Sequence, residues 1–187
     1  CILNPSILHS VRDSYTEEKL KAAGIKNVIN TGCPTMWRLT PEFCTSIPQS
    51  KARNVITTVT DYRQDAEHDN QMLEILGRNY ETVYLWIQGR SDEEYTQSLR
   101  LPTNLQLIPA SLDVYERYLT KGNVDYVGTR LHAGIFALNH HIRSVIVAVD
   151  NRATEMARDT NLMVVQRKDI ASELEKWIIS SWKTKIK

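Results

Sequence analysis

Cysteine is scarce in this 187-residue sequence, and its few copies form no recognisable pattern. The three cysteines, Cys1, Cys33 and Cys44, contain no CxxC pair and are odd in number. This argues against a zinc site and against a disulfide framework, and it favours a reducing compartment, which we expect to be the cytoplasm. A disulfide between Cys33 and Cys44 is the minor alternative.

The sequence also lacks an excess of charge and a long apolar run. Its 23 Lys and Arg against 22 Asp and Glu give a net charge of +1, so nothing draws the whole chain to nucleic acid or to an anionic membrane. Apolar runs such as residues 142–149 are too short to span a bilayer. We therefore expect no nucleic-acid partner and no integral membrane segment, and any anion must be bound by a few placed cations.

Several common motifs are missing. The sequence contains no GxGxxG, no GxxxxGK[ST] and no GxSxG, which argues against a dinucleotide-binding Rossmann site, a P-loop and a nucleophile elbow. The adjacent His140 and His141 diverge on a helix, and no third ligand is suitably spaced. We read them as an exposed helix end and expect no metal site.

What is present is an alternation of short β-branched runs with amphipathic stretches. This pattern is typical of an α/β fold, a Rossmann-like doubly wound parallel sheet. We expect strands at residues 7–11, 27–31, 54–60, 82–87, 105–109, 126–128, 144–149 and 163–166. We expect helices at residues 14–23, 65–76, 112–119, 131–139, 152–159 and 170–182, with Gly24 and Gly77 as termination signals for the first two.

Residues 32–53, GCPTMWRLTPEFCTSIPQSKAR, have three prolines and no sustained period, so they predict a linker. Residues 49–187 hold six expected strands, enough for a complete Rossmann-like C-terminal domain. Residues 1–48 hold one β-α-β unit, too little to bury a core. We expect them to be the tail of an N-terminal Rossmann-like domain plus the linker, and the chain to be a fragment of a larger protein.

Ligands of doubly wound folds bind beyond the carboxyl ends of the strands. In VDYVGTRLHAGIFAL, Arg130 and His132 follow a strand in the first turn of a helix, with Thr129 as the expected N-cap. Arginine next to helix amides can clamp a carboxylate or phosphate, and histidine can exchange a proton near neutral pH. From the residues alone, a histidine satisfied by backbone and an ion pair of Arg130 with Asp125 or Asp150 stay open.

Three other loops carry polar residues after strands: Arg12 and Asp13, Gln88 and Asp92, and Asp150 and Arg152. For each of them a solvated loop or a surface ion pair is the competing interpretation. Gly134, two residues after His132, costs a helix about 1 kcal/mol relative to alanine, which indicates close packing or a closely approaching ligand.

The order of these motifs resembles the polysaccharide pyruvyl transferase family. The resemblance covers about residues 10–162 and is carried by SVRDSYTEEKLKAAGIKNVINTGCPT, NVITTVTDYR, YLWIQGRSDEEY, VDYVGTRLHAGIFAL and SVIVAVDNRATEMARDTNL. It implies a GT-B-like architecture, with two Rossmann-like domains facing across a cleft. It implies a transferase that moves the enolpyruvyl-derived group of phosphoenolpyruvate onto a sugar or glycan acceptor, forming a pyruvate ketal and releasing phosphate. The resemblance further implies a role in exopolysaccharide or capsule biosynthesis and a reaction that needs no cofactor.

The donor-site positions of the family match Arg12, Arg130 and His132 here. We predict that Arg12 and Arg130 hold phosphoenolpyruvate, that Leu131 between the two motif residues points into the core and belongs to the substrate site, and that His132 is the general acid or base. Arg130 is also expected to stabilise charge on the departing phosphate. The candidate substrate contacts beyond these are Gln88, Asp92 and Asp150.

The sequence departs from the family pattern at two places. Gln88 stands where many members carry a histidine, so only hydrogen bonding is expected of it. In HHIRSVIVAVDNR, Arg143 and Ser144 replace an expected Gly-Ile/Val-Pro turn, and no lysine accompanies Arg152.

Two other functions stay open at this point. One is a GT-B-like glycosyltransferase or nucleotide-sugar epimerase, in which Arg130 would hold a diphosphate and Glu155 a ribose. The other is a non-catalytic relative of the fold. The acceptor sugar, the ketal position and the formation of a homo-oligomer are not determined by the sequence.

Overall fold

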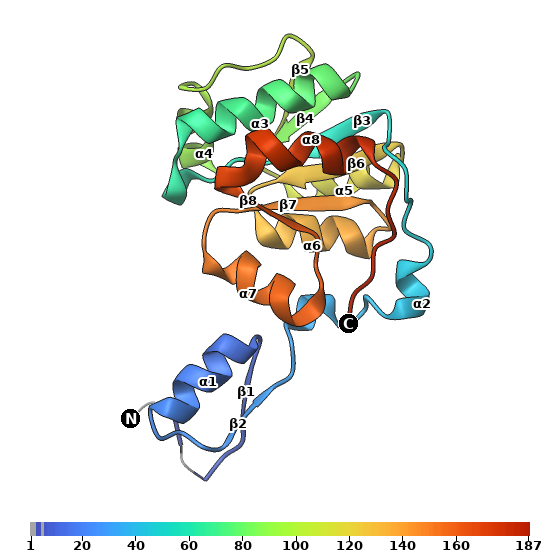
Figure 1. Cartoon of the computed structure of the whole chain (residues 1–187). Coiled ribbons are helices and arrows are strands. Elements are labelled where there is room, and N and C mark those ends of the chain that lie inside the picture. Colours follow the sequence, from blue (N-terminus) through green and yellow to red (C-terminus); the bar gives the residue numbers. More distant parts are fainter. Residues whose placement is uncertain (1–2, 5) are drawn as a thin grey trace.

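The β-branched runs form short parallel strands, and those from residue 54 onward build one sheet (Figure 1). The computed structural model describes residues 3–4 and 6–187. The sheet order is β5-β4-β3-β6-β7-β8, and every neighbouring pair is parallel. Its strands are β3 (Asn54–Thr57), β4 (Val83–Trp86), β5 (Leu105–Ile108), β6 (Val124–Gly128), β7 (Ser144–Ala148) and β8 (Val164–Gln166).

Helices cover both faces of this sheet. They are α3 (Ala66–Asn79), α4 (Arg90–Thr96), α5 (Leu112–Thr120), α6 (Leu131–Asn139), α7 (Asn151–Thr160) and α8 (Glu175–Ile179). Helices α3, α4 and α8 lie over one core with strand residues such as Val55 and Val127, and α5, α6 and α7 lie over the other with Ile56 and Tyr126. Successive strand residues are thus buried on opposite faces, as in parallel sheets generally. No helix in the described part of the chain is long and apolar enough to cross a membrane.

Counted along the chain, the six strands lie in the order 3-2-1-4-5-6, which is the order of a doubly wound Rossmann-like sheet. The α/β prediction is therefore confirmed. The winding reverses between β3 and β6, and Gly128 lets their ends approach closely. A Cβ at Gly128 would lie 2.6 Å from Thr58 Oγ1. In such folds the crevice beyond this reversal point is where ligands bind.

A small β-α-β unit precedes the sheet. It consists of the parallel strands β1 (His9–Val11) and β2 (Val28–Asn30) and the helix α1 (Ser14–Ala22) between them. None of the helical residues of α1, all of which the structure describes, is buried, so the unit has no core of its own. The assignment of residues 1–48 to an N-terminal domain and of 49–187 to a C-terminal domain stays a prediction.

The proline-containing segment after β2 is packed against the main core and is not a free linker. It holds a 3-10 turn (Pro34–Met36) and α2 (Pro41–Cys44), and the turn contacts α6. Five of its side chains are buried in the same core as α6: Cys33, Met36, Leu39, Cys44 and Ile47. The sequence did not predict this, because apolar residues that fill a core from a loop follow no period. Both described cysteines are free thiols, and Cys1 lies outside the described residues.

Three helix predictions are corrected by the structure. Helix α3 continues through Gly77, whose missing side chain makes room for Pro102, since a Cβ there would lie 2.7 Å from Pro102 Cβ. Gly24, by contrast, has a φ of +88° just after α1, as its role as a termination signal requires. Residues 90–96 form α4 and not a loop. The predicted helix 170–182 is a π-helical turn (Ile170–Leu174) followed by the short α8.

Gly134 lies where α6 packs on the sheet, which confirms the close-packing interpretation. A Cβ there would lie 2.6 Å from Ile146 Cγ1 and 2.9 Å from Tyr126 Cε1. We expect Gly134→Ala to lower the free energy of unfolding by about 1–2 kcal/mol, because overpacking a buried contact outweighs the ~1 kcal/mol gained in helix propensity. Urea denaturation measures this. Gly89→Ala, where a Cβ meets nothing within 4 Å, is the control. Unchanged stability of the Gly134 variant would show that α6 can move off the sheet at little cost.

Candidate functional site

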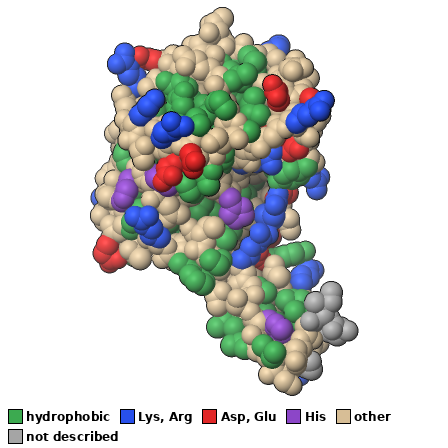
Figure 2. Space-filling model, turned by 180° about the vertical axis from the view of Figure 1, so that it is seen from behind, with side chains coloured by type: hydrophobic (Ala, Val, Ile, Leu, Met, Phe, Trp, Pro, Cys, Tyr) green, Lys and Arg blue, Asp and Glu red, His purple; other side chains and the backbone are tan. Residues whose placement is uncertain are grey.

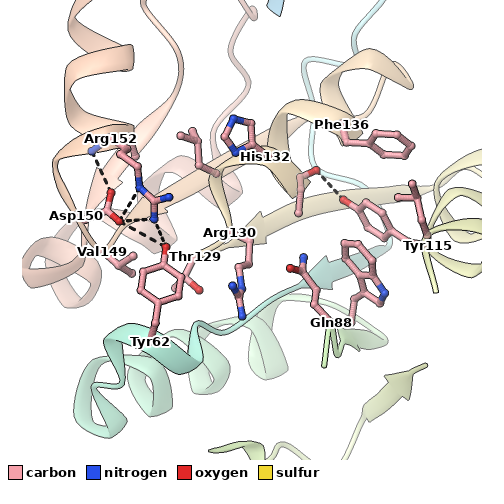
Figure 3. Close-up of a pocket in the computed structure, with 15 residues that line it drawn as sticks. Tyr62, Gln88, Tyr115, Thr129, Arg130, His132, Phe136, Val149, Asp150 and Arg152 are labelled. Carbon is pink, nitrogen blue, oxygen red and sulfur yellow. Dashed lines mark hydrogen bonds and ion pairs between the residues drawn. The ribbon is translucent and has the colours of Figure 1, made fainter. Parts of the chain in front are cut away.

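A cavity of about 390 Å³ opens at the reversal point of the sheet (Figure 3). Its lining comes from the segments after four strands, namely Tyr62 after β3, Gln88 after β4, Arg130 after β6 and Asp150 after β7. The first turn of α6, which contains His132, and the start of α7 complete the wall. Polar and charged groups far apart in the sequence therefore meet here because parallel strands end at one edge.

Arg130 is held at one side of this cavity by two carboxylates. Its Nη2 donates to Asp61 Oδ1 at 2.7 Å and also to Asp92 Oδ1, and its Nε donates to the carbonyl of Val59 at 3.2 Å. Asp92 is buried and also accepts the backbone N–H of Gln88 at 3.1 Å. Arg130 Nη1 has no hydrogen bond to any described residue. The guanidinium is thus fixed in position and keeps one nitrogen for a ligand.

The backbone of Arg130 is fixed as firmly as its side chain. Arg130 itself is the N-cap of α6, and its N–H donates to Thr58 Oγ1 at 3.2 Å. The Thr129 hydroxyl is occupied by the carbonyl of Thr58, at 3.1 Å, so the prediction that Thr129 caps the helix is wrong. No side chain among the described residues caps the first turn of α6, and the residues of this turn, Leu131, His132 and Ala133, line the cavity. Such uncapped amides favour an anion.

The alternative ion pairs weighed for Arg130 do not form. Asp125 binds Arg143, with 2.9 Å between Oδ2 and Nη1. Asp150 binds Arg152, with 2.9 Å between Oδ2 and Nε. Arg130 instead pairs with Asp61 in the 3-10 turn after β3 and with Asp92 in the first turn of α4.

His132 lies at the edge of the cavity with its side chain open to solvent. Its Nε2 is 3.8 Å from Cys33 Sγ. Partial burial lowers the pKa of His132, and the charges of Arg12 and Arg152 lower it further. The imidazole is therefore neutral at pH 7 and able to accept a proton. In Figure 3 its ring and the Arg130 guanidinium point away from each other.

Arg152, Asp150 and Tyr62 form a second polar cluster on the cavity wall (Figure 3). Asp150 caps α7 by accepting the N–H of Arg152 at 3.0 Å. Burial acts to raise the pKa of Asp150, but hydrogen bonds from Arg152 outweigh it, so the pKa is lowered. The guanidinium carbons of Arg130 and Arg152 each lie 5.4 Å from the centroid of the Tyr62 ring. Tyr62 therefore contacts both arginines through its ring, as in cation–π pairs.

The other end of the cavity is apolar. Trp86 and Tyr115 stack there with their ring centroids 4.0 Å apart and their planes 3° from parallel, and Phe136 adjoins Tyr115. These aromatics could not be singled out from the sequence, because they fall at core positions of their strand and helices. The cavity thus combines a charged end with an aromatic end.

Arg12 reaches the site from the small β-α-β unit and does not line the cavity itself. Its Nε donates to Asp13 Oδ2 at 3.3 Å, and it acts on His132 through its charge. Figure 2 shows basic side chains beside a histidine just above the narrow connection to this unit.

The predicted site residues thus divide into two groups. Those in the cavity wall are Gln88, Arg130, Leu131, His132 and Asp150. Arg12 lies beside the wall, and Asp92 lies behind Arg130, where its contacts are to protein groups. Leu131 is buried as predicted. Asp61, Tyr62 and Cys33 were missed. The sequence TDYR directly after a strand was a usable signal for the first two, since it falls at the same edge of the sheet.

These features define a class of protein, an α/β protein with a Rossmann-like sheet and an arginine-containing cavity at its reversal point. In the described part of the chain, no three His, Cys, Asp or Glu side chains are grouped to hold a metal ion. The chain matches the polysaccharide pyruvyl transferase family over residues 1–151, and it belongs to this family. A search of curated proteins found no match. The family indicates a transferase with a sugar or polysaccharide acceptor.

Proposed function

We propose that this protein transfers the enolpyruvyl-derived group of phosphoenolpyruvate to two hydroxyls of a sugar or glycan, forming a cyclic ketal and releasing phosphate. The observation that supports this best is a cavity whose wall contains Arg130, His132 and Arg152. A donor with a carboxylate and a phosphate needs several cations and amides in one place. Membership in the family supplies the class of reaction.

The charges favour an anion near His132 more than one deep beside Arg130. Two carboxylates offset the charge of Arg130, which leaves its Nη1 as a fixed hydrogen-bond donor. Arg12 and Arg152 each have one close carboxylate, Asp13 and Asp150, and both remain partly exposed. We therefore place the phosphate of the donor between these two arginines and the uncapped amides of α6.

In this proposal His132 takes the proton of a sugar hydroxyl as its oxygen attacks C2 of the donor. C3 of the enol gains a proton and becomes the methyl group, and the C2–O bond to phosphate breaks when the second hydroxyl attacks. One hydroxyl hydrogen ends on C3 and the other leaves with phosphate, so atoms and charges balance. A bound anion offsets the charges of Arg12 and Arg152, which raises the pKa of His132 and lets it hold the proton it has taken.

We further propose that residues 1–48 belong to an N-terminal domain facing residues 49–187 in a GT-B-like arrangement. The β1-α1-β2 unit supports this, because it has no core of its own and carries Arg12 toward the cavity. An acceptor would enter from the side of this unit.

A nucleotide-sugar function has less support. Glu155, the predicted ribose contact, lies outside the cavity wall, and its Oε2 is 2.9 Å from Arg158 Nη2 on the same helix. A non-catalytic role makes a different prediction, namely donor binding without turnover.

Incubation with phosphoenolpyruvate and a panel of sugars tests the proposal. We expect phosphate release that requires an acceptor, together with a ketal product identified by mass spectrometry. Parallel reactions omit the acceptor or replace the donor with a nucleotide sugar. Consumption of the nucleotide sugar alone would transfer the assignment to a glycosyltransferase, and binding of phosphoenolpyruvate without product for any acceptor would favour a non-catalytic relative.

A further inference from the structure

Asp159 joins α7 to the small β-α-β unit. Its Oδ2 accepts the backbone N–H of Ser14 at 2.5 Å, and its Oδ1 accepts the Ser14 hydroxyl at 2.6 Å. Asn30 of β2 donates its side-chain amide to Oδ2 at 3.3 Å. Arg158 adds a bond from Nη2 to the Ser14 hydroxyl at 2.8 Å. One carboxylate therefore gathers three donors, all of them from the small unit.

The helix that carries Asp159 gives no reason for a carboxylate at this position. Asp159 lies in the last turn of α7, where a negative charge opposes the helix dipole. It lies instead against the first residue of α1, at the positive end of that helix. Burial acts to raise the pKa of Asp159, but the bonds from Ser14 outweigh it, so the pKa is lowered and the group is ionised at pH 7.

A short series of contacts connects Asp159 to Arg12. Ser14, which Asp159 binds, directly follows the buried Asp13. Asp13 caps α1 by accepting the N–H of Thr16 at 2.7 Å, and it also accepts a bond from Arg12. The turn that presents Arg12 is thereby fixed to α7, whose other end carries Arg152 into the cavity wall.

We propose that Asp159 is a positioning residue that holds the β1-α1-β2 unit on α7 and so fixes the turn that presents Arg12. The expected effect of Asp159 on KM and kcat rests on the proposed function. Its expected effect on the position of Arg12 does not. None of the helical residues of α1, all described, is buried, so apolar packing of that helix does little to hold the unit in place. The Asp159 carboxylate accepts three hydrogen bonds from the unit and so contributes a polar connection between the two parts.

Titration of the His132 ring by NMR tests this without any substrate. The charged or titratable groups around His132 are Arg12, Arg152 and the Cys33 thiol. We expect Arg12→Gln to raise the pKa of His132 by removing a neighbouring cation. We expect Asp159→Asn to raise it as well, because Arg12 is released, and the double variant to raise it no further than Arg12→Gln alone.

The sign of the Asp159→Asn shift separates positioning from direct electrostatics. Losing a negative charge acts directly to lower the pKa of a histidine, whereas losing Arg12 from its side raises it. Ser14→Ala removes one donor and keeps all charges, so a smaller upward shift is expected. Lys21→Gln, on the exposed face of α1, is the matched control and should leave the titration unchanged.

Two results would overturn the proposal. One is an unchanged or lowered pKa of His132 in folded Asp159→Asn, and the other is an unchanged pKa in Arg12→Gln. In turnover, Asp159→Asn should raise KM for phosphoenolpyruvate by a larger factor than it lowers kcat. If the unaltered protein does not turn over phosphoenolpyruvate, the proposed function fails while the NMR shifts still decide the role of Asp159.

Discussion

His132→Ala is expected to lower kcat for ketal formation by about 10²- to 10⁴-fold, which is the usual contribution of a positioned general acid or base. The side chain lies at the open edge of the cavity, and its ring makes a single long hydrogen-bond contact in the described part of the chain, to Cys33 Sγ at 3.8 Å. Its removal should therefore leave the fold intact. Phosphate release at saturating phosphoenolpyruvate and acceptor measures the loss, and the circular dichroism spectrum checks the fold.

His140→Ala is the matched control for this variant. His140 directly follows α6, where its Nδ1 donates to the Phe136 carbonyl at 2.8 Å and its Nε2 lies 3.0 Å from Glu116 Oε1. It does not line the cavity. We expect its kcat to be unchanged. An unchanged kcat in His132→Ala would remove His132 from the proposed mechanism.

The pH dependence of kcat/KM reports the role of His132 separately. Because the pKa of His132 is lowered from 6.5, a general base there gains activity as the pH rises through a value below 6.5. A kcat/KM that falls through the same range would show that the protonated imidazole acts, as a general acid.

The strands were predictable because a parallel sheet buries both faces of its strands, and such strands appear as short β-branched runs. Residues 144–149 and 54–60 are examples. Helix α4 was missed because its sequence, RSDEEYT, is polar except for one aromatic residue. The segment 32–53 was read as a linker for a related reason, since its buried residues are held by tertiary contacts and not by a local period.

For the site, the position of a residue after its strand predicted whether it would reach the cavity. It did not predict which side chains would bind it. The rule that ligands bind beyond the carboxyl ends of strands correctly predicted that Gln88, Arg130 and Asp150 would line one cavity. The carboxylates that bind Arg130 come from the ends of β3 and β4, and the strand order that brings those ends beside β6 is a property of the whole sheet. The order of strands in a sheet cannot be read directly from a single sequence.

Arg143, which replaces the turn expected from the family, proves to be a buried structural residue. Its side chain is 1% exposed, and its Nη1 donates to Asp125 Oδ2 at 2.9 Å. The same carboxylate accepts the Tyr80 hydroxyl at 2.7 Å. Arg143 Nη2 donates to three carbonyls at the end of α8, those of Trp177, Ile178 and Ser180. One guanidinium therefore balances a buried charge and caps the last helix.

We expect Arg143→Met to lower the free energy of unfolding by about 3–5 kcal/mol at pH 7, because it leaves a buried carboxylate without its cation and takes a donor from three carbonyls. Of these carbonyls, that of Trp177 keeps a bond from Trp182 Nε1 at 3.1 Å. Burial already raises the pKa of Asp125 against the opposing effect of Arg143, so the variant should hold a proton there and its deficit should shrink as the pH falls. Urea denaturation at two pH values measures both effects. Arg53→Met, which breaks an exposed pair with Glu81, should cost at most about 1 kcal/mol. A loss in Arg143→Met no larger than that would mean that the buried network contributes no more than a surface ion pair, and that the apolar side chains of α8 and the contacts of Glu175 with Arg78 and Asn79 are enough to keep it docked.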